Sequence, residues 1–136
     1  MNFQHFIDAQ NPVISAVMDE LRAGHKRTHW MWFVFPQHVG LGRSPMAKRF
    51  GLGSIEDARA YLTDPILGGR LVACTEVVLA NRARSAREIF GSPDDLKFRS
   101  CMTLFASAVP QQAIFQLALD MYFAGELDPL TAALLA

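Results

Sequence analysis

One stretch indicates the fold most clearly, and it reads Ser92-Pro-Asp-Asp-Leu-Lys-Phe-Arg-Ser-Cys-Met-Thr-Leu-Phe-Ala-Ser-Ala108. A short polar residue followed by proline is typical of a helix start. The polar side chain accepts a hydrogen bond from the first turn, and proline has no amide to leave unpaired. Behind this start, apolar residues recur at helical spacing, at Phe98, Cys101, Met102, Phe105 and Ala108. The stretch therefore predicts a helix with one buried face.

The same start signal recurs along the chain, at Asn11-Pro12, Ser44-Pro45, Asp64-Pro65 and Asp128-Pro129. Two capping-box patterns, Ser54-x-x-Asp57 and Ser85-x-x-Glu88, add further helix starts. Apolar residues at helical spacing follow in 13–21 and 67–78. Residues 111–124 are apolar nearly all round and end at Gly125, so this helix is expected at the centre of the core.

Shorter helices are expected at 3–9, 45–50, 55–63, 86–90 and 129–135. Only residues 30–35 have a spacing that also suits a strand. The sequence therefore predicts an all-α fold, a compact single-domain bundle of about eight helices, several of them short, that spans residues 1–136.

Composition excludes several classes of protein. The chain has 136 residues, of which 51% are hydrophobic and 19% charged, so it can bury a core and is not disordered. Its formal net charge is zero, which argues against nucleic acid as a partner. Cys74 and Cys101 form no CxxC motif and are expected as buried free thiols. With no secretory leader and no apolar run longer than 30–36, the predicted location is cytoplasmic, away from membranes.

The charge is unevenly distributed. Residues 21–55 contain six Lys and Arg and no acidic residue, whereas the rest of the chain has seven Lys and Arg against thirteen Asp and Glu. This basic stretch includes Gly40-Leu-Gly-Arg-Ser-Pro45, where two glycines lead into a helix start. Free amides and an arginine suit an anion such as phosphate, although an ordinary loop explains the pattern equally well. The candidate anion ligands are Lys26, Arg27, Gly40, Gly42, Arg43 and Ser44.

An aromatic run lies in the same stretch, His29-Trp-Met-Trp-Phe-Val-Phe-Pro-Gln37. Trp30 and Trp32 could form a wall on which a planar ligand stacks, with His29 and Gln37 as polar contacts, or they could fill the core. His25 and His29 have the i, i+4 spacing of metal ligands on a helix. Because basic residues separate them and no acidic ligand is near, no metal and no cofactor are predicted.

The third candidate segment is the start of the 92–108 helix. Asp95 and Arg99 are spaced for an ion pair. Lys97 and Ser100 share another face and could point into a pocket. If the protein catalyses a reaction, Asp94, Asp95 and Lys97 are the candidate catalytic residues, although Asp94 and Asp95 also suit the helix dipole.

Several of these motifs resemble one family. They are His25-Lys-Arg-Thr-His-Trp-Met-Trp-Phe-Val-Phe-Pro-Gln37, Gly40-Leu-Gly-Arg-Ser44, Ala60-Tyr-Leu62, Leu67-Gly-Gly-Arg-Leu71 and the segment from Ile89 to Phe105. The chain is similar over about residues 3–134 to the bacterial domain of unknown function 1810 family. That resemblance implies a compact, mainly helical domain and no established activity. The label calpastatin, sometimes attached to such sequences, does not fit, because calpastatins are long and disordered.

Two functions remain open, and the sequence does not decide whether the protein is an enzyme. In the first, a pocket binds a small phosphate-bearing ligand such as a nucleotide or an ADP-ribose derivative, and the protein could also process that ligand. In the second, a non-enzymatic interaction module docks an acidic partner on its basic face. The first requires segments 25–44 and 92–100 to converge on one pocket. The oligomeric state is left open.

Overall fold

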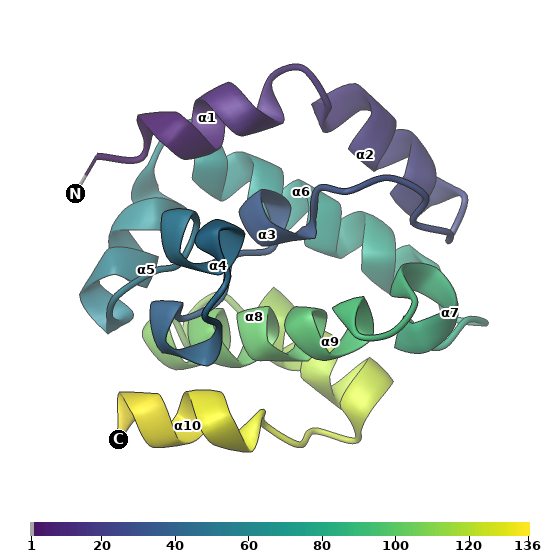
Figure 1. The fold of residues 1–136 in the computed structure, drawn as a ribbon. Helices are drawn as coiled ribbons and strands as arrows, with labels where there is room; N and C mark the ends of the chain where they lie inside the picture. Colours follow the sequence, from purple (N-terminus) through teal and green to yellow (C-terminus); the bar gives the residue numbers. More distant parts are fainter. Residues whose placement is uncertain (1) are drawn as a thin grey trace.

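The computed structural model describes residues 2–136, which form ten α-helices and one 3-10 helix (Figure 1). The α-helices are α1 (Gln4–Gln10), α2 (Ile14–Arg22), α3 (Met31–Val34), α4 (Pro45–Arg49), α5 (Ile55–Thr63), α6 (Leu67–Ala80), α7 (Ala86–Phe90), α8 (Asp94–Ala108), α9 (Ile114–Phe123) and α10 (Pro129–Leu135). The 3-10 helix η1 (Val39–Leu41) lies between α3 and α4. Within residues 2–136 there is no β-strand, only an isolated bridge between His38 and Leu52. The predicted all-α bundle is confirmed.

Most of the predicted caps are formed. Ser44, Ser54, Ser85 and Asp128 each accept a hydrogen bond from the backbone amide three residues on. Asp64 accepts bonds from the amides at 66 and 67, as a cap does, although α6 itself begins only at Leu67. These local signals place the starts of α4, α5, α7 and α10 at the predicted residues.

Two predicted caps are wrong. The side-chain oxygen of Asn11 accepts a hydrogen bond from Arg70 on α6, and α2 begins two residues after Pro12 without a side-chain cap. Ser92 does not cap α8 either; the helix begins at Asp94, with Pro93 before it and no side-chain cap. In the case of Asn11, a long-range partner takes the oxygen that the local pattern assigned to the helix.

The core is organised around α8, which packs against α5, α7, α9 and α10. The five apolar residues that predicted this helix are all buried. The predicted position of 111–124 at the centre of the core is wrong. The observed helix, α9, buries only one side and exposes Leu117 and Met121, because its apolar residues outnumber the positions that α6 and α8 can cover.

Residues 30–35 form no strand; they contain the one-turn helix α3, whose Met31, Phe33 and Val34 are buried. Cys74 and Cys101 are buried free thiols, as predicted. No helix among the described residues is long and apolar enough to cross a membrane. In Figure 1, α10 lies at the end of the molecule opposite α1 and α2, beside α8. This position matters for the candidate site, because α10 forms one of its walls.

Candidate functional site

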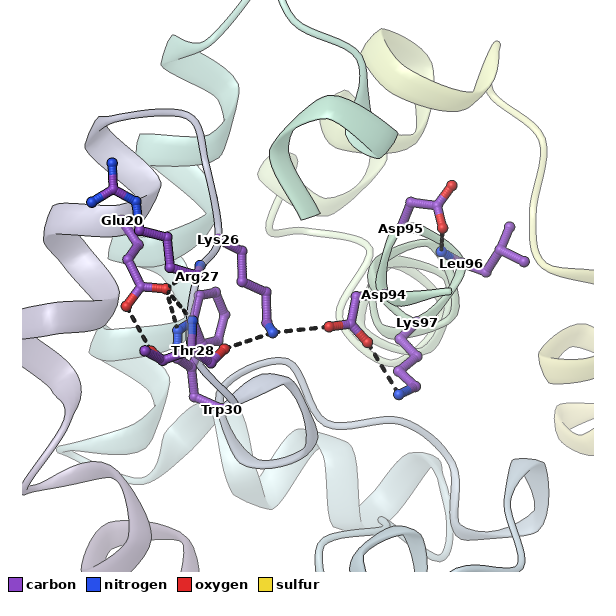
Figure 2. Close-up of polar contacts among 9 residues, drawn as sticks. All are labelled: Glu20, Lys26, Arg27, Thr28, Trp30, Asp94, Asp95, Leu96 and Lys97. Atoms are coloured by element: carbon purple, nitrogen blue, oxygen red, sulfur yellow. Dashed lines mark hydrogen bonds and ion pairs between the residues drawn. The ribbon is translucent and has the colours of Figure 1, made fainter. Parts of the chain in front are cut away.

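An ion-pair cluster joins the loop between α2 and α3 to the first turn of α8 (Figure 2). The ammonium nitrogen of Lys26 lies 3.0 Å from Oδ2 of Asp94, and that of Lys97 lies 3.1 Å from Oδ1 of the same carboxylate. The Lys26 side chain is only 8% exposed, whereas that of Lys97 is 21% exposed. The cluster therefore carries one net positive charge, and Lys97 is its more accessible cation.

A buried carboxylate, Glu20, holds the loop that carries Lys26. It accepts hydrogen bonds from the backbone amides of Arg27 and Thr28, from the Thr28 hydroxyl and from the Trp30 indole (Figure 2). Burial raises the pKa of Glu20, but these four hydrogen bonds outweigh it and lower the pKa to about 2. Glu20 is therefore ionised at neutral pH and fixes the loop on which Lys26 faces Asp94.

Lys97 also contacts an aromatic ring. Its ammonium nitrogen lies 3.9 Å from the centroid of the Trp32 ring, which is well within the range of a cation–π interaction. Asp94 on its own helix and Trp32 in α3 thus hold the Lys97 ammonium from two sides. A cation held in this way loses little side-chain freedom when it binds a ligand anion.

The Lys97 side chain lines a hollow of about 260 Å³ between α8, α10 and the segment from α3 to η1. Its walls are formed by Trp32, Gln37, Leu41, Gly42, Pro93, Leu96, Lys97, Ser100, Asp128 and Leu130. Most of this lining is apolar, with a few polar groups at fixed positions, which is the usual composition of a ligand site. The volume is just below the usual range for such sites, roughly 300–1,000 Å³, and suits a small ligand.

The hollow brings together five of the residues that the sequence singled out: Trp32, Gln37, Gly42, Lys97 and Ser100. Lys26 and Asp94 adjoin it through their ion pairs with each other and with Lys97. Segments 25–44 and 92–100 therefore converge on one pocket, which the local sequence pattern could not decide. The predicted common face of Lys97 and Ser100 is confirmed, because both residues line this hollow.

Other candidates lie outside the lining of the hollow: Arg27, His29, Trp30, Gly40, Arg43, Ser44 and Asp95. Trp30 is 1% exposed and donates its indole hydrogen to Glu20, so it belongs to the core and cannot form a stacking wall. Two groups of the proposed anion loop are already engaged: the Gly40 amide donates to the His38 imidazole, and the Ser44 hydroxyl caps α4.

Two further i, i+4 spacings do not act as they would on an isolated helix; at the first of them, His25 and His29, the sequence predicts no metal. His25 and His29 are exposed in a loop and do not share a helix face, and residues 2–136 hold no cluster of side chains suited to a metal ion. The expected ion pair between Asp95 and Arg99 is not formed among the described residues. Arg99 instead contacts the Glu126 carboxylate and the carbonyls of Glu126 and Leu127, because the segment before α10 passes beside it.

The two aspartates at the start of α8 differ in their surroundings. Burial raises the pKa of Asp94, but hydrogen bonds and charges from Lys26 and Lys97 hold that pKa below its ordinary value. A carboxylate that stays ionised between two ammonium groups is a poor proton carrier near neutral pH. Asp95 points away from both lysines and accepts a hydrogen bond from the Leu96 amide (Figure 2). Neither aspartate has the surroundings of a general acid.

The sequence missed half of the lining, namely Leu41, Pro93, Leu96, Asp128 and Leu130. Leu96 could have been found, since it lies one turn before Ser100 on the same helix. No local signal links Asp128 and Leu130 to Lys97, because the packing of α10 on α8 brings them there.

Comparison with known proteins agrees with the fold. The crystal structure of the conserved hypothetical protein Rv1873 from Mycobacterium tuberculosis has a TM-score of 0.95 to this chain and 53% sequence identity. The match covers 97% of this chain and 94% of that one. Among curated proteins, none matches. The family model described as protein of unknown function (DUF1810) matches residues 1–135. The chain therefore belongs to the DUF1810 family.

Proposed function

We propose that this protein binds a small ligand that carries a phosphate or carboxylate group, in the hollow lined by Lys97. The observation that supports this most is the placement of the Lys97 ammonium between Asp94 and Trp32 at the wall of that hollow. Because Lys26 and Lys97 share one carboxylate, the cluster has one positive charge left for a ligand anion. The Asp128 carboxylate also lines the hollow and opposes that anion. The Gln37 amide on the same wall provides a neutral hydrogen-bond donor, whereas the Ser100 hydroxyl already donates to the Leu96 carbonyl.

The size of the hollow limits the ligand. A volume of about 260 Å³ is below the range that surrounds a drug-sized molecule, roughly 300–1,000 Å³. A phosphate with one small organic group fits this volume better than a whole dinucleotide. We therefore expect a phosphate monoester to bind at least as tightly as ADP-ribose does.

The test is calorimetric titration of the protein with inorganic phosphate, phenyl phosphate and ADP-ribose at fixed ionic strength. We expect Lys97→Met, which keeps the aliphatic contact with Trp32, to weaken phenyl phosphate binding at least tenfold. Lys97→Arg keeps the charge and retains most of the affinity. Lys48→Met is the matched control, because it removes an exposed lysine of α4 outside the hollow.

Equal affinity of the wild type and Lys97→Met for phenyl phosphate would overturn the proposal. An equal loss in Lys48→Met would overturn it too, because the anion would then be responding to the basic surface as a whole. Both variants lower the net charge by one, so long-range electrostatics cancels in the comparison.

One observation favours the second candidate, an interaction module that docks an acidic partner. Among the described residues, four cations of the 21–55 stretch form no ion pair and are exposed: Arg27, Arg43, Lys48 and Arg49. Such a surface attracts acidic molecules with a strong dependence on salt. Binding of an acidic protein that is weakened by Lys48→Met and unaffected by Lys97→Met would support this function.

A further inference from the structure

A second hollow adjoins the candidate site. It also has a volume of about 260 Å³, and its walls are Gly40, Leu41, Leu130, Ala133 and Leu134. Leu41 and Leu130 line both hollows, so the two spaces are neighbours on either side of these two side chains. The second hollow has only glycine, alanine and leucine in its walls, whereas the first contains Lys97, Ser100 and Gln37. The joined space is thus polar at one end and apolar at the other.

The walls of the apolar end are exposed to solvent. Leu130 is 68% exposed and Leu134 is 43% exposed, and their i, i+4 spacing on α10 puts both on one side of that helix. Leu96 on α8 is also exposed and lines the first hollow. Single exposed leucines are ordinary on a protein surface, but these three border two adjoining hollows, where one ligand can contact them together.

The aromatic groups near the site do not favour a nucleobase. Trp30 is buried in the core, and the Lys97 ammonium already lies over the Trp32 ring. The rest of the apolar lining is aliphatic: Leu41, Leu96, Leu130, Ala133 and Leu134. An aliphatic chain packs on such a surface as well as any other apolar group does, and it requires no free ring for stacking.

We infer that the ligand of the candidate site is a single-chain amphiphilic anion, with a phosphate or carboxylate headgroup and an unbranched alkyl chain. This inference rests on the proposed function, because it needs the anion at Lys97. The headgroup lies in the first hollow against Lys97, and the chain passes Leu41 and Leu130 to reach Leu134 in the second. The two joined hollows accommodate one headgroup and one chain, which favours a free single-chain molecule over a two-chain membrane lipid.

The dependence of affinity on chain length tests this arrangement. Each methylene group that leaves water for an apolar surface tightens binding about fourfold. Calorimetric titration would compare inorganic phosphate with ethyl, butyl, hexyl and octyl phosphate, all below the concentrations at which they form micelles. We expect the affinity to rise with each methylene by less than this factor, because one side of the chain stays in water, and then to level off once the chain fills the second hollow.

Variants of α10 separate the chain from the headgroup. Leu134→Ser should leave the affinity for inorganic phosphate unchanged and reduce the gain from the longer chains, whereas Leu134→Met should preserve that gain. Leu117→Ser is the matched control, because it removes an exposed leucine from α9, which lines neither hollow. Lys97→Met should weaken all members of the series by a similar factor.

Each result has a distinct meaning. If phosphate binds in a Lys97-dependent way but longer chains bind no more tightly, the inference is overturned and the proposed function stands. If neither phosphate nor any alkyl phosphate binds, both fail. A gain with chain length that Leu117→Ser reduces as much as Leu134→Ser does would also overturn the inference. So would binding to vesicles that contain phosphatidic acid, without any binding of hexyl or octyl phosphate.

Discussion

The ammonium nitrogen of Lys26 lies 3.0 Å from Oδ2 of Asp94, and this ion pair connects the loop after α2 to the first residue of α8. Lys26 also donates a hydrogen bond to the Thr28 carbonyl in its own loop. Because the lysine is 8% exposed, its charge depends on these two partners. The pair therefore determines where the candidate site's loop and helix lie relative to each other, and it does so without facing the hollow itself.

Asp94→Asn should destabilise the protein by about 2 kcal/mol, since it leaves the largely buried Lys26 ammonium without an anion. The control is Asp95→Asn, which makes the same charge change in the same helical turn. Asp95 has no ion pair among the described residues, so its substitution should change stability by less than about 0.5 kcal/mol. Urea unfolding of both variants gives the comparison, and equal losses would show that the ion pair contributes nothing beyond the helix dipole.

Glu20 predicts a specific acid sensitivity. Its pKa is about 2 in the folded protein and 4.5 is its ordinary value, so its stabilising contribution is complete above pH 4.5 and is lost as the pH falls through 2. This pKa shift corresponds to a contribution of roughly 3 kcal/mol to the free energy of unfolding at neutral pH. Glu20→Gln should therefore lower stability most at pH 7 and much less at pH 2.5, as measured by urea unfolding across this range.

The control for Glu20→Gln is a glutamate whose carboxylate accepts no hydrogen bonds of this kind. Glu76 on α6 is exposed and accepts no side-chain hydrogen bond among the described residues, so Glu76→Gln should lower stability at pH 7 far less than Glu20→Gln does. A difference between wild type and Glu20→Gln that stays constant from pH 7 to pH 2.5 would contradict the lowered pKa.

Two neighbouring glycines of α6 should respond in opposite ways to alanine. A Cβ atom at Gly68 would collide with the carbonyl oxygen of Leu62, at the close approach of α5 and α6. A Cβ atom at Gly69 would meet nothing within 4 Å. Gly68→Ala should lower the free energy of unfolding by several kcal/mol or prevent folding. Gly69→Ala should raise it by roughly 0.5–1 kcal/mol, because alanine has the higher helix propensity. Thermal unfolding of the two variants measures this, and a tolerated Gly68→Ala would contradict the close approach.

These residues show what the sequence could and could not predict. Capping residues such as Ser85 and the i+4 spacing from Phe98 onward are local signals, and they predicted the elements correctly. Trp30 and Trp32 look alike in the sequence, yet one is in the core and the other contacts Lys97. What separates them is the partner of each ring. Trp30 meets Glu20, ten residues before it, and Trp32 meets Lys97 from a distant part of the chain.

The candidate site depends on the same kind of long-range contact. Lys97 and Ser100 were predictable as one face of a helix, because both lie in α8. The walls opposite them are formed by Asp128 and Leu130, whose position follows from how α10 packs on α8. Arg99 shows the same limit, since its real partners at Glu126 and Leu127 displace the ion pair that local spacing predicted.

Asp128 gives a further test of the charge in the hollow. It lines the same space as Lys97, and its Oδ2 atom accepts hydrogen bonds from the amide and the hydroxyl of Thr131, which cap α10. Asparagine caps helices about as well as aspartate does, so Asp128→Asn should preserve stability to within about 0.5 kcal/mol. Asp128→Ala removes the cap and should cost about 1–2 kcal/mol.

Asp128→Asn should change ligand binding even though it preserves the fold. Because Asp128→Asn removes a negative charge from the wall of the hollow, it should tighten phenyl phosphate binding a few-fold, since a like charge is removed at partly solvated range. Raising the salt concentration should shrink this gain, because mobile ions screen the carboxylate that the wild type keeps. Calorimetric titration at two ionic strengths measures both effects. An affinity that Asp128→Asn leaves unchanged at low salt would mean that the anion binds beyond the reach of this carboxylate, and so outside the hollow that Lys97 lines.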